Sequence, residues 1–94
     1  MNLDGVHVPL VTPFDSSGDV DAKGIAHLVE VMLANNLNGI VAVGTTGEAY
    51  ALTFEERQTV ISTIVSQVKG RVPVLAGIGG MSTGEAIKQT KLAA

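Results

Sequence analysis

The sequence predicts an α/β fold: residues 1–94 are expected to form an incomplete TIM-barrel domain, the first three βα units of a (β/α)8 barrel. Three observations favour this fold. Strand-like and helix-like patterns alternate three times along the chain. The strand-like runs carry few polar residues, as is typical of parallel strands that are covered on both faces. The runs begin near residues 6, 39 and 72, a repeat of 33 residues, and a complete barrel has about 31 residues per unit.

The three expected strands are short runs rich in β-branched residues, at positions 6–11, 40–43 and 72–76. Consecutive parallel strands require right-handed crossovers, which the intervening helices supply. A doubly wound parallel sheet is the alternative architecture. Such sheets usually carry a glycine-rich phosphate-binding fingerprint, and Gly77-Ile78-Gly79-Gly80 lacks the spacing of that fingerprint.

The expected helices are marked by capping residues and by apolar stripes. Asp21 is expected to cap the first helix. Thr53 and Glu56 form a capping-box pattern at the start of the second helix, and Ser82 and Glu85 repeat that pattern before a third helix that runs to the end of the chain. The expected core stripes are Ile25, Leu28, Val29, Met32 and Leu33 in the first helix, and Val60, Ile61, Ile64, Val65 and Val68 in the second.

Composition excludes several classes of function. The chain is 46% hydrophobic and carries nine acidic against six basic side chains, which argues against nucleic acid or an anionic membrane as a partner. The absence of cysteine excludes a disulfide scaffold and a Cys-ligated metal site. The apolar runs are too short to span a bilayer and the start of the chain lacks the pattern of a signal peptide, so we expect a cytoplasmic protein.

The most informative segment is residues 44–48, Gly-Thr-Thr-Gly-Glu, which follows the second expected strand. In a barrel the carboxyl ends of the strands form the catalytic face. Because glycines flank Thr45 and Thr46, the backbone can turn tightly and present amide and hydroxyl donors to one small anion such as a carboxylate. The alternative is a structural turn whose threonines cap neighbouring backbone groups. By spacing alone these residues slightly favour the structural turn, because turns of this composition are common.

The remaining candidate residues have structural interpretations beside functional ones. No acidic cluster flanks His7 or His27, so no metal site is expected. His7 is interpreted as a satisfied core histidine and His27 as a solvated helix residue. Tyr50 fits the wall of a site, an interface or ordinary packing equally well. The charged helix residues expected to face solvent are Glu30, Glu55, Glu56 and Arg57.

Four segments resemble a known family in order and spacing: VPLVTPF at 8–14, the run from 39 to GTTGE at 44–48, LTFEER at 52–57 and VPVLAG at 72–77. They are similar to the dihydrodipicolinate synthase and N-acetylneuraminate lyase family over essentially the whole chain. The resemblance implies a (β/α)8 barrel, usually a homo-oligomer built as a dimer of dimers. It also implies a Schiff base between pyruvate and a barrel lysine, followed by formation or cleavage of a carbon–carbon bond. No cofactor or metal is expected.

The resemblance also assigns roles to the 44–48 segment. Thr45 and Thr46, with Gly47 beside them, would bind the carboxylate of pyruvate. Thr45 would also be catalytic, as part of a hydroxyl proton relay with tyrosines. The family's Schiff-base lysine and relay tyrosines correspond to positions beyond residue 94, and the four lysines present lie on expected helices or at their ends. The 94 residues alone are therefore expected to be inactive, and the parent enzyme active.

The threonine pair favours the synthase branch of the family, which condenses pyruvate with an aldehyde in lysine biosynthesis. Three alternatives remain: an aldolase that cleaves a sugar-derived 2-oxo acid, a remnant that binds carboxylates without turnover, and an inactive assembly fragment. Of the effector positions in lysine-inhibited synthases, Glu85 matches the pattern, whereas Phe54, Arg57 and Met81 depart from it. Feedback inhibition by lysine is therefore not expected.

Overall fold

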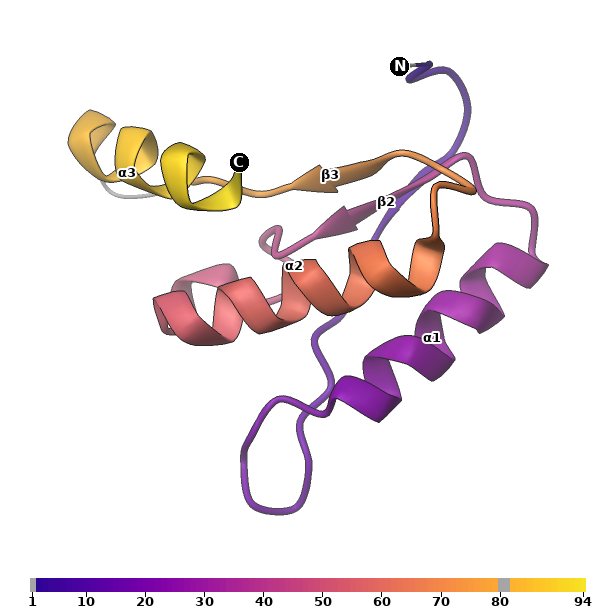
Figure 1. Cartoon of the computed structure of the whole chain (residues 1–94), viewed down its shortest axis with the longest axis horizontal. Coiled ribbons are helices and arrows are strands. Elements are labelled where there is room, and N and C mark those ends of the chain that lie inside the picture. The colour runs from indigo at the N-terminus through magenta and orange to yellow at the C-terminus, as the bar shows by residue number, and fades with distance from the viewer. Residues whose placement is uncertain (1, 80–81) are drawn as a thin grey trace.

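The computed structural model describes residues 2–79 and 82–94; Gly80 and Met81, used above, lie outside these ranges. The elements follow in the expected alternating order (Figure 1). They are β1 (His7–Pro9), α1 (Ala22–Ala34), β2 (Gly39–Ala42), the short 3-10 helix η1 (Ala49–Ala51), α2 (Phe54–Val68), β3 (Val74–Ala76) and α3 (Thr83–Ala93).

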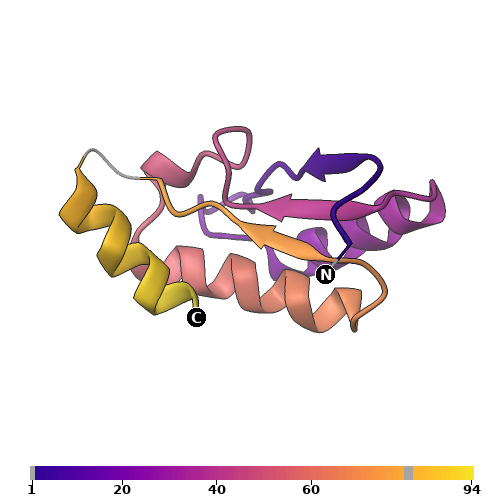
Figure 2. The same cartoon turned by 90° about the horizontal axis from the view of Figure 1, so that it is seen from above.

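The strands form one parallel sheet in the order β1-β2-β3, which confirms the predicted α/β class. Ile40 at the centre of the sheet lies opposite Val8 on one side and Val74 on the other. Helices α1 and α2 pack against each other and lie on the same face of the sheet (Figure 2). Consecutive right-handed crossovers place their helices on one face both in a barrel and in one half of a doubly wound sheet, so this arrangement is compatible with either architecture.

Strands β1 and β3 are shorter than the apolar runs that predicted them, and β2 is shifted by one residue toward the N-terminus. The side chains of Val6 and Val11 are more than half exposed, and β1 includes neither residue. β2 ends before Val43, because a φ of +47° takes that residue out of the extended region. Pro73 has no N–H to donate to a neighbouring strand, and β3 begins just after it.

All three predicted helix starts are confirmed. A carboxylate oxygen of Asp21 accepts from a backbone amide in the first turn of α1 at 3.0 Å. At the start of α2 the Thr53 hydroxyl accepts from the Glu56 amide at 3.1 Å, and the Glu56 carboxylate accepts from the Thr53 amide at 2.8 Å, a complete capping box. The Ser82 hydroxyl accepts from the Glu85 amide at 3.1 Å at the start of α3.

The core lies between the sheet and the paired helices α1 and α2. Its largest fully buried side chains are Ile25, Val29, Ile40, Val43, Val60, Ile64 and Val68. Two predictions for α2 were wrong: Val65 is 51% exposed and Arg57 is only 8% exposed. Positions 57, 60, 64 and 68 share one helix face, so Arg57 continues the buried stripe toward the carboxyl end of the sheet. Among the residues described, no helix is long and apolar enough to cross a membrane.

Candidate active site

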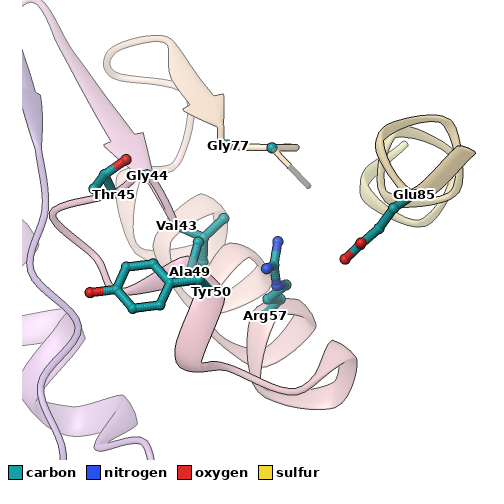
Figure 3. A pocket seen from close by; sticks show the side chains of 9 residues that line it. Val43, Gly44, Thr45, Ala49, Tyr50, Arg57, Gly77 and Glu85 are labelled. Atoms are coloured by element: carbon teal, nitrogen blue, oxygen red, sulfur yellow. The ribbon is translucent and has the colours of Figure 1, made fainter. Parts of the chain in front are cut away.

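A cavity of about 480 Å³ lies where β2 and β3 end, at the carboxyl edge of the sheet (Figure 3). Its wall combines the loop after β2, the loop after β3, η1, and the first turns of α2 and α3. The lining residues are Val43, Gly44, Thr45, Ala49, Tyr50, Arg57, Gly77, Gly79 and Glu85. In a parallel sheet this edge gathers the loops that follow consecutive strands, so residues far apart in sequence meet there.

The 44–48 loop is folded by its own backbone. The Glu48 amide donates to the Thr45 carbonyl at 3.0 Å, and the Ala49 amide donates to the Gly44 carbonyl at 3.3 Å. Glu48 has a φ of +59°, the left-handed conformation that closes the turn. Within residues 2–79 and 82–94, the amides from Thr45 to Gly47 and both threonine hydroxyls donate to no protein acceptor. The loop therefore offers unpaired donors to a small anion.

Thr12 connects this loop to the segment after β1. Its hydroxyl donates to the Gly47 carbonyl at 2.7 Å, and the residue is only 5% exposed. We did not single out Thr12 as a site residue from the sequence. The signal that could have found it is a polar side chain placed just after an apolar strand, on the face where functional loops gather.

The ends of β2 and β3 approach each other closely at Gly77. The Gly77 amide donates to the Ala42 carbonyl at 2.8 Å. A Cβ atom at this position would overlap the carbonyl oxygen of Val43 and would lie 2.9 Å from the carbonyl carbon. Val43 itself is buried, and a positive φ is a genuine outlier for a β-branched residue. Glycine at position 77 is thus required for the backbone to pass the base of the 44–48 loop.

The opposite wall of the cavity links α2 to α3. The Arg57 guanidinium donates to the side-chain oxygen of buried Gln89 at 2.8 Å. Figure 3 shows the side chains of Arg57 and Glu85 pointing toward each other across the cavity. Gln89 was not predicted from the sequence as a partner of Arg57, and it supports this wall without being one of the lining residues. Met81, the fourth position of the effector comparison after Phe54, Arg57 and Glu85, lies outside the described residues.

The predicted site residues share one loop but not one environment. Thr45 and Thr46 are both exposed, but of these two only Thr45 lines the cavity, and Gly47 is buried. Tyr50 lines the cavity and is 78% exposed.

His7 is half-buried: its Nε2 lies 2.8 Å from the Leu3 carbonyl oxygen, while its buried Nδ1 has no partner among the described residues. The interpretation of His7 as a fully satisfied histidine was therefore wrong.

The remaining titratable candidates lie on helices. His27 is exposed on α1, which confirms its interpretation as a solvated residue. Lys23 belongs to α1, Lys69 caps α2, and Lys88 and Lys91 belong to α3. The Lys88 ammonium lies 5.0 Å from the centre of the Phe54 ring. No lysine is among the residues that line the cavity as described.

An α/β chain with unpaired donors beside a cavity at the carboxyl edge of a parallel sheet has the features of a small-molecule-binding α/β protein. Comparison with known proteins narrows this class. A model of the dihydrodipicolinate synthetase family matches residues 2–94, and the chain belongs to this family. The 4-hydroxy-tetrahydrodipicolinate synthase of Pseudomonas aeruginosa is 52% identical over 89 residues, which cover 95% of this chain and 30% of that protein.

Solved structures agree with this assignment. The dihydrodipicolinate synthase of Acinetobacter baumannii, described as chloride-inhibited and complexed with pyruvate, superposes with a TM-score of 0.94 at 46% identity. That match covers 98% of this chain and 32% of the other. The N-acetylneuraminate lyase of Mycoplasma synoviae superposes with a TM-score of 0.86 at 31% identity, over 98% of this chain and 33% of that one. The chain thus spans about a third of the length of these relatives.

Proposed function

We propose that residues 1–94 form the first three βα units of a barrel domain and carry the pyruvate-binding loop of a 4-hydroxy-tetrahydrodipicolinate synthase. One observation supports this most directly: at the carboxyl edge of the sheet and beside a cavity, the amides of residues 45–47 and the two threonine hydroxyls have no acceptor among the described residues. The relatives named as this synthase share 40–52% identity with the chain, and the Acinetobacter relative was solved with pyruvate.

In this proposal the donors of Thr45 and Thr46 bind the carboxylate of pyruvate, with the Gly47 amide at the back of the loop. Thr45 lines the cavity, and its hydroxyl then passes a proton between the reacting centre and a tyrosine relay. Carboxylates accept several hydrogen bonds at once, and such charge-assisted bonds are about twice as strong as neutral ones. A cluster of unpaired donors on one short loop suits that ligand.

The covalent step requires a lysine outside the four described here. A lysine amine adds to the keto carbon of pyruvate, the keto oxygen leaves as water, and the resulting iminium withdraws electrons from the neighbouring carbon. Lys23, Lys69, Lys88 and Lys91 lie on helices or a helix end and not at the end of a strand. We therefore propose that the reactive lysine belongs to a part of the enzyme other than these residues.

A chimera tests the proposal. Residues 1–94 would replace the matching segment of the Pseudomonas aeruginosa relative, and the product would be incubated with pyruvate and borohydride. We expect a trapped pyruvate adduct by intact mass, located by peptide mapping on a lysine outside residues 1–94, together with condensation of pyruvate with an aldehyde. The chain alone, treated in the same way, is expected to give no adduct. An adduct on any of its four lysines would overturn the proposal.

Two matched variants separate the roles of the threonines. In the chimera, Thr45→Val keeps the side-chain shape and removes the proposed relay hydroxyl, so kcat should fall by roughly 10²–10⁴. Thr46→Val should mainly raise the KM for pyruvate, because it removes a donor that acts in binding. If Thr45→Val turns over at the wild-type rate, the relay role is wrong. A sugar-derived 2-oxo acid, offered as substrate to the unmodified chimera, tests the aldolase alternative.

We further propose that the active assembly is a homo-oligomer. Tyr50 lines the cavity and is 78% exposed. Exposed aromatic side chains of this kind are often buried in the interfaces between subunits. One solved relative is described as a monomeric variant of the synthase, so assembly must be measured for this chain. Light scattering of the chimera and of its Tyr50→Ala variant provides that test, and a monomeric unmodified chimera would refute it.

A further inference from the structure

The conformation of the 44–48 loop depends on a residue more than thirty positions earlier in the chain. Thr12 and Gly47 are joined by a 2.7 Å hydrogen bond from the Thr12 hydroxyl to the Gly47 carbonyl. Both residues are buried, and no other side chain within the described residues donates to this loop. A buried carbonyl that loses its only donor carries the full cost of desolvation, so this bond strongly favours one loop conformation.

The surroundings of Gly47 are already close-packed. A Cβ atom there would lie 3.0 Å from the Leu10 carbonyl oxygen and 3.2 Å from the Thr12 hydroxyl oxygen. The loop thus rests directly on the segment after β1. Because the Gly47 carbonyl points to Thr12, the peptide plane between Gly47 and Glu48 is held on that side. The Thr45 carbonyl is occupied by the Glu48 amide.

We infer that Thr12 is a positioning residue: its hydroxyl holds the Gly47 carbonyl and thereby fixes the conformation of the 44–48 loop, whose unpaired amides from Thr45 to Gly47 are the donors proposed for the anion. Thr12 does not line the cavity and acts through Gly47. The inference rests on the proposed function for the identity of the anion, the pyruvate carboxylate. The claim about loop conformation holds with or without that ligand.

The test uses the ¹⁵N-labelled full chain. Thr12→Val removes the donor and keeps the β-branched shape, whereas Thr12→Ser keeps the donor. Thr59→Val is the control, because it removes a similar hydroxyl-to-carbonyl bond, 3.0 Å long, on the exposed side of α2. Without ligand, Thr12→Val should shift the amide resonances of residues 44–48 and lower their heteronuclear NOE values. Thr12→Ser and Thr59→Val should leave both at wild-type values.

Titration with pyruvate supplies the functional measurement. We expect Thr12→Val to bind pyruvate about tenfold more weakly, a difference of roughly 1.4 kcal/mol, and Thr12→Ser to restore the affinity. If Thr12→Val is unfolded by circular dichroism, Thr12→Cys replaces it: the thiol is close to serine in shape but is a weak donor. Lower heteronuclear NOE values for residues 44–48 in the cysteine variant, but not in the serine variant, then support the inference.

The outcomes separate the two claims. A wild-type chain whose loop resonances do not respond to pyruvate contradicts the proposed function, and the ligand-free comparison still decides the role of Thr12. A donor-deficient variant with wild-type loop resonances and NOE values overturns the inference. So does a wild-type pyruvate affinity in Thr12→Val, because the hydroxyl would then have no effect on the site. A uniform change across the chain, without focus on residues 44–48, shows a merely structural role and also overturns it.

Discussion

Substitution of Gly77 by alanine should damage both the fold and the 44–48 loop. The added Cβ would overlap the Val43 carbonyl oxygen, and it would lie 2.9 Å from the carbonyl carbon and 3.2 Å from the Gly44 Cα. Every one of these atoms belongs to the backbone at the end of β2, so no flexible side chain can move aside. Carbon atoms pack at about 3.5–4.0 Å. The two chain segments must therefore separate by at least about 0.6 Å.

That separation has two energetic consequences. Forcing an extra methyl group into a filled space typically destabilises a protein by about 1–3 kcal/mol. The 2.8 Å hydrogen bond from the Gly77 amide to the Ala42 carbonyl joins the same segments and would lengthen, and such a bond contributes about 0.5–1.5 kcal/mol. A loss of about 2 kcal/mol is a conservative sum. For a chain of this size it corresponds to a fall in Tm of roughly 8–16 °C.

Thermal unfolding followed by circular dichroism measures this fall. Gly79→Ala is the matched control in the same loop, because a Cβ at Gly79 meets no atom of the described residues within 4 Å; its Tm should stay within about 4 °C of the wild type. In the chimera, Gly77→Ala should also raise the KM for pyruvate, since the displaced Val43 is the residue before the loop. Equal Tm values for the two alanine variants would refute the steric argument.

Three further substitutions give independent outcomes. Arg57→Met removes the guanidinium that donates to buried Gln89, so the free energy of unfolding, measured with urea, should fall by about 1–3 kcal/mol; an unchanged value would show that this contact does not stabilise the fold. Hydrogen bonds from Arg71 lower the pKa of Glu30 from 4.5 to about 2, so ionised Glu30 stabilises the fold above pH 4.5 and this contribution disappears as the pH falls toward 2. The difference in urea midpoint between wild type and Glu30→Gln should shrink over that interval, and a difference independent of pH would contradict the assignment. Gly84→Ala adds a Cβ on α3 that meets no atom of the described residues within 4 Å, so it should raise stability by up to about 1 kcal/mol; a lower Tm would contradict this prediction.

Features governed by local chemistry were predicted well from the sequence. The caps at Asp21, Thr53 and Ser82 each depend on a side chain and an amide within three residues, so sequence spacing contains the information. The strand runs were found because parallel strands covered on both faces need uninterrupted apolar residues. The ends of the strands were predicted less accurately. Pairing stops where the neighbouring strand stops, and the local sequence does not contain that information.

Features set by tertiary packing were missed or misjudged. Arg57 was assigned to solvent by its charge, although its spacing from Val60 and Ile64 places it on the buried stripe; its partner, Gln89, comes from a different helix. Val65 fits a helical stripe equally well, but it lies on the flank of α2 that nothing in the described chain covers. Periodicity identifies a face of a helix, whereas the neighbouring elements determine how wide the buried part of that face is.

In the candidate site, too, some features depend on the local sequence and others on tertiary packing. The Gly-Thr-Thr-Gly-Glu sequence supplies donors and flexible residues, but flexible residues alone would not hold three amides toward one anion. The Thr12 hydroxyl binds the loop from the side of β1, and the close approach of Gly77 confines its base from the side of β3. Because these contacts come from strands on either side, the loop acquires its geometry only when all three strands are paired. The anion binding that we propose for this site would therefore be a property of the folded sheet, and the loop sequence supplies only the chemical groups.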